Sequence, residues 1–338
     1  MMTRLSLSDV ELARETISPI AIKTPFLVSG GFSASAGQEV LLKLESMQPI
    51  GAFKLRGAAN AILNLPERTA GVVCCSTGNH GRGVAFAARR AGMRAVVCLS
   101  ALVPGTKIDG IRALGAEVRI MGQSQDDAQA EVARLVASEG LVEVSPFDDP
   151  YVIAGQGTIA LEMLAERPDL GTVIVPLSGG GLAGGIALAA KALKPSIRVI
   201  GVTMDTGPAM YHSIRAGHPV EVREAGSLAD SLGGGIMDDN RLTLDLCTRL
   251  LDETLLVSEE EIYHAMQALF FDEKLVAEGA ACVGLAALLA GRAVPAPGPV
   301  GVVVSGRNVD AHLFADIIAG RDVRVGTTRI VGRAYDGH

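Results

Sequence analysis

Short apolar runs alternate with helical stretches along most of this chain, and this alternation constrains the fold more than any other feature. The runs are Val40–Leu44, Gly71–Cys75, Ala95–Ser100, Glu117–Met121, Thr172–Leu177, Arg198–Thr203 and Val300–Ser305. The helical stretches are Gly81–Ala91, Ser124–Glu139, Ile159–Arg167, Ala183–Ala192 and Glu259–Phe271. Several runs are continuously apolar, as expected for strands buried on both faces of a parallel sheet. The pattern predicts an α/β protein with two open, mostly parallel sheets and helices on both faces.

Composition narrows the class of protein. The 338 residues exceed what one core comfortably organises, which predicts two lobes. The net charge of −7, without a Lys/Arg block, argues against nucleic acid or an anionic membrane as a partner. No apolar run is long enough to span a membrane, and acidic residues near the start (Asp9, Glu11, Glu15) do not fit a secretion signal. We therefore expect a cytoplasmic protein.

The five cysteines lie in apolar stretches and lack a C-x-x-C spacing, so they are predicted to be reduced, buried thiols. Pro, Asp and Gly residues within Phe147–Gly157 suggest a segment that crosses between lobes. The basic, irregular Arg321–His338 is interpreted as a loose tail, with an arm against a partner subunit as the alternative.

A glycine-rich turn follows the run that ends at Leu177. Its residues, Ser178, Gly179, Gly180, Gly181 and Leu182, lead from a strand into a helix. Exposed backbone N–H groups and a helix N-terminus together suit a phosphate group. A βα turn without a ligand is one alternative. A dinucleotide site is another, because Gly179, Gly181 and Gly184 satisfy G-x-G-x-x-G and Asp205 follows the next strand; it would make the protein a nicotinamide dehydrogenase.

Lys54 lies in the glycine-bracketed segment Gly51–Gly57, beside Phe53. Glycines allow the backbone to approach a ligand closely, and a partly desolvated lysine has a lowered pKa that suits a nucleophile or base. Phe53 offers a flat face to a flat ligand. An ordinary lysine at a helix start is the alternative.

Two further strand ends carry polar groups. In Ser76–Gly81, Ser76 and Thr77 suit an anion such as a substrate carboxylate, and Asn79 can donate to a ring oxygen. His80 is interpreted as a structural histidine, and a plain helix cap is the alternative for the segment. Ser305 ends a buried strand and can donate to an uncharged pyridine nitrogen.

In this order, the motifs resemble the fold-type-II pyridoxal-phosphate enzymes, specifically the threonine dehydratase and serine racemase group. The matching segments are Gly51–Gly57, Ser76–Gly81, Ile153–Thr158, Ser178–Leu182 and Ser305–Asn308. The resemblance implies a fold like the tryptophan synthase β-subunit. It also implies a large cofactor-binding domain from residues 1–65 and 149–338, and a small substrate-side domain from residues 66–148.

For the site, the resemblance implies pyridoxal 5'-phosphate bound covalently by Lys54. Its other cofactor-binding residues would be Phe53, Asn79, Ser178, Gly179, Gly180, Gly181, Leu182 and Ser305. Ser76, Thr77, Gly78, Asn79 and His80 would bind the substrate, with Lys54 and Thr77 catalytic. Racemase-like members hold a divalent metal through a glutamate and an aspartate where this chain has Thr203 and Ala209, so no metal is expected there.

The resemblance implies a dehydratase that releases ammonia and a 2-oxo acid from a β-hydroxy-α-amino acid, with a homodimer as the expected assembly. Within the group the chain looks most similar to hydroxyectoine-utilisation dehydratases, judged from Ser76–Gly83, Pro146–Pro150 and Ala229–Ile236. A catabolic dehydratase acting on threonine, serine or 3-hydroxyaspartate is the alternative. A β-replacement synthase of the same fold and the dehydrogenase remain more distant ones.

Overall fold

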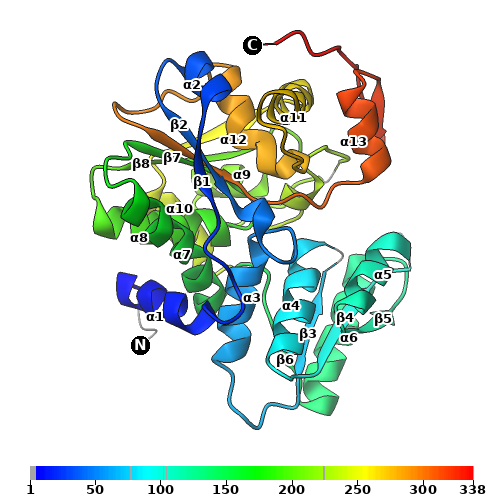
Figure 1. Cartoon of the computed structure of the whole chain (residues 1–338). Helices are drawn as coiled ribbons and strands as arrows, with labels where there is room; N and C mark the ends of the chain where they lie inside the picture. The colour runs from blue at the N-terminus through cyan, green and yellow to red at the C-terminus, as the bar shows by residue number, and fades with distance from the viewer. Residues whose placement is uncertain (1–4, 77, 102, 104, 224, 338) are drawn as a thin grey trace.

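Two parallel-stranded sheets form the centres of two lobes in the computed structural model, which describes residues 5–76, 78–101, 103, 105–223 and 225–337 (Figure 1). The strands are β1 (Phe26–Ser29), β2 (Val40–Leu44), β3 (Val72–Cys75), β4 (Ala95–Leu99), β5 (Glu117–Ile120), β6 (Val142–Glu143), β7 (Thr172–Pro176), β8 (Arg198–Met204), β9 (Glu253–Val257), β10 (Val300–Val304), β11 (Val323–Val325) and β12 (Thr328–Ile330).

The α-helices are α1 (Leu7–Ile17), α2 (Gly30–Ala36), α3 (Lys54–Leu63), α4 (Asn79–Arg90), α5 (Gly105–Ala113), α6 (Gln125–Glu139), α7 (Pro150–Glu166), α8 (Gly181–Leu193), α9 (Ala209–Ala216), α10 (Thr243–Leu250), α11 (Glu259–Glu273), α12 (Gly279–Leu289) and α13 (Ala311–Ile318). Two 3₁₀ turns, η1 (Glu45–Met47) and η2 (Asp230–Leu232), complete the described elements.

The larger sheet has the strand order β1-β2-β10-β7-β8-β9, in which only the edge strand β1 is antiparallel. Its strands alternate between two cores. Ile174 faces a core built with α11 and α12, whereas Val173 and Val175 face one built with α7 and α8. Helices therefore cover both faces, and the predicted α/β architecture is confirmed.

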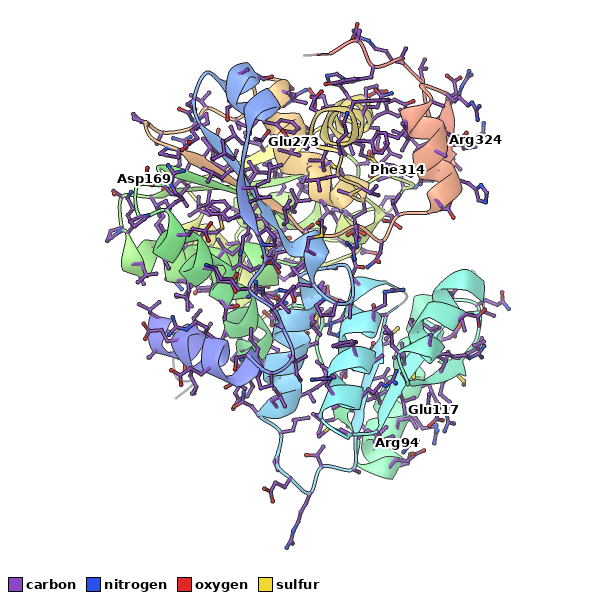
Figure 2. The ribbon with its side chains drawn as sticks, in the orientation of Figure 1. Arg94, Glu117, Asp169, Glu273, Phe314 and Arg324 are labelled. Carbon is purple, nitrogen blue, oxygen red and sulfur yellow. The ribbon has the colours of Figure 1, made fainter. Side chains whose placement is uncertain are left out.

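The smaller sheet is fully parallel, in the order β5-β4-β3-β6. One face packs on α3 and α4, and the other packs on α6 through Val73 and Val96. At its outer edge Arg94 forms ion pairs with Glu117 and Glu139, and Figure 2 shows Arg94 and Glu117 close together, far from the labelled residues of the other lobe. Exposed pairs of this kind contribute little to stability.

Helices α3 and α7 pack unusually closely because glycines lie where they meet. A Cβ on Gly155 would lie 2.6 Å from the Arg56 carbonyl oxygen and 2.8 Å from the Gly57 Cα. A Cβ on Gly57 would in turn lie 2.9 Å from the Val152 carbonyl oxygen. The helix that begins at Lys54 is thus held backbone to backbone against the larger lobe.

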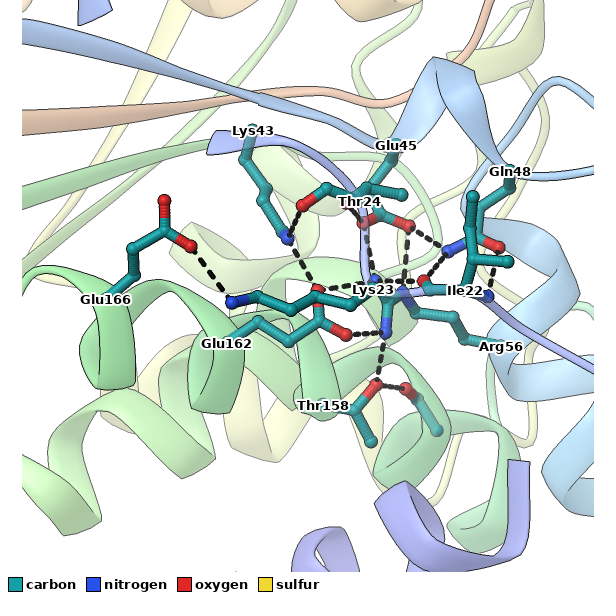
Figure 3. Close-up of polar contacts among 11 residues, drawn as sticks. Ile22, Lys23, Thr24, Lys43, Glu45, Gln48, Arg56, Thr158, Glu162 and Glu166 are labelled. Carbon is teal, nitrogen blue, oxygen red and sulfur yellow. Dashed lines mark hydrogen bonds and ion pairs between the residues drawn. The ribbon is translucent and has the colours of Figure 1, made fainter. Parts of the chain in front are cut away.

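A buried ionic cluster reinforces this contact (Figure 3). Arg56 binds Glu45 through Nε and one terminal nitrogen, both at 2.8 Å, and binds Glu162 at 2.6 and 2.9 Å. Lys43 Nζ contacts the second oxygen of Glu162 at 2.5 Å. Burial opposes charge on Arg56, but the two carboxylates raise the pKa of Arg56 above its ordinary value. The cluster connects β2, η1, α3 and α7.

Three details differ from the sequence-based expectations. Helix α7 begins at Pro150, nine residues before the predicted start, because Asp149 caps it by accepting the N–H of Val152 at 2.9 Å and Pro150 suits the first helical turn. Only the first part of the predicted Phe147–Gly157 crossing is therefore irregular.

The interpretation of Arg321–His338 as a loose tail was wrong for its described residues: β11 and β12 form a hairpin, and Gln267 donates to the Arg333 carbonyl at 2.8 Å.

All five cysteines are free thiols, as predicted, although Cys75 is only half-buried. No helix in the described part of the chain combines the length and apolarity needed to cross a bilayer.

The Gly155 contact can be tested by substitution. Gly155→Ala should lower the free energy of unfolding by about 1–3 kcal/mol, because the new methyl group forces α3 and α7 apart. Denaturant unfolding measures the change. Gly30→Ala in α2 is the matched control, since its Cβ meets nothing within 4 Å, and should change stability by less than about 0.5 kcal/mol. Equal stabilities of the two variants would contradict the tight contact.

Candidate active site

A cavity of about 1040 Å³ lies where strands of both sheets end. It is lined from the smaller lobe by Cys75, which ends β3, and from the larger lobe by Pro176, Met204 and Ser305, which lie at or beyond the ends of β7, β8 and β10. Carboxyl ends of parallel strands are where α/β proteins bind ligands. Of the predicted site residues that the structure describes, all line this cavity. Thr77 lies outside the described residues.

Lys54 begins α3, and its amine lies on the cavity wall. Nζ donates to the Pro146 carbonyl oxygen at 2.7 Å and lies 5.4 Å from the centre of the Phe53 ring. Burial lowers the pKa of Lys54 to about 8, and no described carboxylate pairs with it. The amine is thus easily freed of its proton, which suits a base or nucleophile.

The segment before Lys54 is joined to the strand end at Ser305. The Phe53 N–H donates to the Ser305 carbonyl at 3.0 Å, and the Arg307 N–H donates to the Gly51 carbonyl at 2.9 Å. Gly51 has φ of +78°, a conformation that strongly favours glycine. This short antiparallel contact brings Lys54 and buried Ser305 to the same cavity.

The glycine-rich turn leads from β7 into α8. Gly180 has φ of +88°, and a Cβ there would lie 2.7 Å from the Met210 methyl and 2.9 Å from Thr243 Cβ. Gly179 and Gly181 pack against Phe147. Side chains at these three positions would collide with the neighbouring protein, so the close packing of the turn requires glycines. The turn lines the cavity at the N-terminus of α8, where backbone N–H groups and the helix dipole favour an anion.

Asn79 lies at the start of α4 and is oriented by two partners. Its Nδ2 donates to Glu278 Oε1 at 2.8 Å, and its Oδ1 accepts from Asn308 Nδ2 at 2.6 Å. Asn308 is itself held by the Ile50 carbonyl at 2.9 Å. Glu278 shows which side of the amide carries the nitrogen. Since Nδ2 makes no second hydrogen bond to a described residue, its other N–H can donate to a ligand oxygen.

Ser76, Gly78 and His80 form the rest of the predicted substrate loop. Ser76 Oγ accepts the Gly78 N–H at 3.3 Å, and His80 Nε2 lies 2.8 Å from the Val144 carbonyl. Nε2 must donate in that contact. Burial and the nearby positive charge of Lys54 lower the pKa of His80 to about 3. His80 is therefore a neutral, structurally bonded histidine, in agreement with the sequence-based interpretation of that side chain.

Sequence reasoning missed the roles of the segment Val144–Asp148, which only partly overlaps the predicted crossing Phe147–Gly157. Its carbonyl groups bind His80 and Lys54, Phe147 packs on the glycine turn, and Asp148 accepts three backbone N–H groups at the start of α10. It missed Glu278 as well, because a single glutamate before a helix carries no distinguishing pattern. Among the described residues, no three His, Cys, Asp or Glu side chains converge as metal ligands.

Comparison with known proteins gives the family. A family model described as pyridoxal-phosphate-dependent enzyme matches residues 17–306. The chain belongs to this family. The match excludes the dinucleotide interpretation of the glycine-rich turn.

Two relatives illustrate the similarity in sequence. A Sinorhizobium fredii protein provisionally named a threonine dehydratase is 52% identical over 94% of this chain and 97% of its own length. The L-threonine ammonia-lyase of Thermotoga maritima is 40% identical over 93% of this chain and 78% of its own length. The chain is thus a member of the family with threonine dehydratase-like relatives.

Two solved structures illustrate the similarity in fold. Maize serine racemase has a TM-score of 0.88 at 31% identity and covers 94% of this chain, with 98% of its own chain matched. Threonine deaminase isoform 2 of Solanum lycopersicum has a TM-score of 0.86 at 30% identity, covering 93% of this chain and 86% of its own. These matches confirm the fold-type-II architecture.

The residues present fit pyridoxal phosphate. The glycine turn lines the cavity at a helix N-terminus that suits a phosphate, the oriented Asn79 amide can donate to an oxygen, and Lys54 offers a primary amine in the same cavity. Ser305 provides a neutral hydroxyl instead of a carboxylate, so a pyridine nitrogen beside it would stay unprotonated.

The lowered pKa of Lys54 predicts a pH dependence in cofactor-free protein. Below about pH 8 the amine is protonated and unreactive, and above it the amine is neutral, so labelling by an amine-directed reagent should rise with a midpoint near pH 8. His80 should contribute no step between pH 5 and 9. Mass analysis of the peptide that contains Lys54, with peptides of exposed lysines as controls, measures the midpoint. A midpoint near 10.5 would contradict the desolvated environment.

Proposed function

We propose that this enzyme is a dehydratase that converts a β-hydroxy-α-amino acid into a 2-oxo acid and ammonia. The observation that carries the proposal is the Lys54 amine, which has no described carboxylate partner and lines the same cavity as the glycine turn and as Ser76, Gly78, Asn79 and His80. The threonine dehydratase-like relatives support the same reaction class.

The larger lobe would hold the cofactor, with one further contact, from Asn79, supplied by the smaller lobe. Residues Ser178 to Leu182 would bind its phosphate, Phe53 would contact its ring, Asn79 would donate to its ring hydroxyl, and Ser305 would meet its ring nitrogen. When bound, pyridoxal phosphate supplies an aldehyde that reacts with amines and a ring that withdraws electrons from the carbon to be deprotonated. We assign residues 1–65 and 149–338 to this lobe and 66–148 to the smaller one, consistent with the two sheets.

Proton transfer would be the task of Lys54. Once the substrate amine has taken its place, the Lys54 amine can accept the α-proton through Nζ, and the Pro146 carbonyl keeps that nitrogen in position. The substrate carboxylate would bind at the N-terminus of α4, to Ser76, Gly78, Asn79 and His80. We assign to Thr77 the donation of a proton to the leaving hydroxyl.

The cavity wall bears on the choice of substrate. Glu143 and Asp239 contribute carboxylates, and the cationic Arg241 is engaged by Asp239 at 3.4 Å. Such a wall disfavours an acidic substrate such as 3-hydroxyaspartate. It accepts threonine or serine and suits a substrate with a second amine, such as the hydroxylated diaminobutyrate expected in hydroxyectoine breakdown. We propose these as the candidate substrates, and a symmetric dimer as the assembly.

Lys54→Ala tests the proposed reaction. The variant should lose the visible absorbance of the attached cofactor, and ammonia release should fall more than about a thousandfold because no base remains to remove the α-proton. Ammonia is measured over threonine, serine, 3-hydroxyaspartate and hydroxylated diaminobutyrates. Lys23→Ala, an exposed lysine paired with Glu166, is the control and should retain both signals.

Two outcomes would contradict the proposal. Retained turnover in Lys54→Ala would remove Lys54 from the mechanism. Wild-type protein that binds the cofactor but releases ammonia only when a thiol captures the dehydrated product would favour a β-replacement synthase instead.

A further inference from the structure

Two consecutive aspartates, Asp148 and Asp149, cap two different helices. Asp149 caps α7, which follows it directly, whereas Asp148 caps α10, which begins far along the chain. We propose that Asp148 is a positioning residue for the cofactor phosphate: it holds α10 against the glycine turn and so sets the shape of that turn. The inference rests on the proposed cofactor site. Asp148 lines the same cavity, but both its carboxylate oxygens bind backbone N–H groups of residues 241–243.

The contacts of Asp148 are complete and specific. Oδ1 accepts the N–H groups of Leu242 at 3.0 Å and Thr243 at 2.8 Å, and Oδ2 accepts the N–H of Arg241 at 2.7 Å. These donors lie at the N-terminus of α10, where helix geometry leaves N–H groups without internal partners and favours a negative charge. Both oxygens are thereby occupied, so the carboxylate acts as a tether.

The tethered end of α10 contacts the glycine turn. A Cβ on Gly180 would lie 2.9 Å from Thr243 Cβ and 3.1 Å from Cys247 Sγ, and Cys247 lies one turn further along the helix. Cys247 Sγ also donates to the Gly180 carbonyl at 3.7 Å. Because these groups are in van der Waals contact, a shift of the first turn of α10 must move Gly180 or open a gap beside it.

The residue before Asp148 also supports the turn. Phe147, the residue before Asp148, packs against Gly179 and Gly181. Phe147 thus packs on the first and third glycines and α10 packs on the second, and Asp148 links these two supports. A short segment from the boundary of the smaller lobe thereby sets the geometry of N–H donors in the larger lobe.

Asp149 provides a matched control within the same sequence. Its Oδ1 accepts the Val152 N–H at 2.9 Å, so Asp149→Ala also removes a helix cap. The closest contacts of the three glycines come from Phe147, Met210, Thr243 and Cys247, and none comes from Asp149. Loss of the α7 cap should therefore lower stability without a selective effect on the glycine turn.

The test compares pyridoxal phosphate with pyridoxal, which lacks the phosphate. Affinities of wild type, Asp148→Ala, Asp148→Asn and Asp149→Ala are measured by titration of the absorbance that follows covalent attachment. Asp148→Ala should weaken pyridoxal phosphate binding about tenfold and pyridoxal binding less than about twofold. Asp148→Asn should lie between wild type and Asp148→Ala, because an amide oxygen can still accept from Leu242 and Thr243.

Asp149→Ala should leave the ratio of the two affinities at its wild-type value. Equal weakening of both ligands by Asp148→Ala, or the same phosphate-selective loss in Asp149→Ala, would overturn the role of Asp148. If Asp148→Ala does not fold, the ratio of the pyridoxal phosphate and pyridoxal affinities of Asp148→Asn tests the role of Asp148 instead. Wild-type protein that binds neither ligand would instead contradict the proposed function, and the inference with it, so the two failures are distinguishable.

Discussion

The position of α3 depends on charges that are buried together. Arg56, Glu45 and Lys43 are almost completely buried, and Glu162 closes the cluster from α7. Removal of one partner from such a group leaves an uncompensated charge, at a cost of about 3–5 kcal/mol. The cluster and the glycine contact with α7 therefore permit one placement of α3. Because Lys54 is the first residue of that helix, the position of its amine at the cavity depends on residues that do not themselves line the cavity.

A second constraint acts on the amine itself. Burial lowers the pKa of Lys54, and the hydrogen-bond partner of its amine is a neutral carbonyl, which does not offset that loss of solvation as a carboxylate would. A carboxylate in the place of Pro146 would have had the opposite effect. Two nearby cationic residues therefore differ in environment. Arg56 is paired with carboxylates and has a structural role, whereas Lys54, two residues earlier, has no described carboxylate partner and a lowered pKa.

The sequence alone predicted those parts of the candidate site that have a recognisable local pattern. The glycine turn, the lysine segment and Ser305 each follow or precede a recognisable strand, and parallel strands bring their carboxyl ends to one edge. It did not reach Glu278, Asn308 or the tether of Asp148, because those roles depend on partners distant in sequence. The hairpin at Val323–Ile330 was missed for a related reason: Val323 and Ile330 are buried in the core that includes residues of α11 and α13, and its three-residue strands carry no clear pattern of their own.

The account depends most directly on covalent attachment of the cofactor to one amine. Protein saturated with pyridoxal phosphate, reduced with borohydride and digested, should carry the pyridoxyl group on the peptide that contains Lys54, with the mass increase localised to that residue. Attachment at another lysine, or an unmodified Lys54 in fully saturated protein, would contradict it.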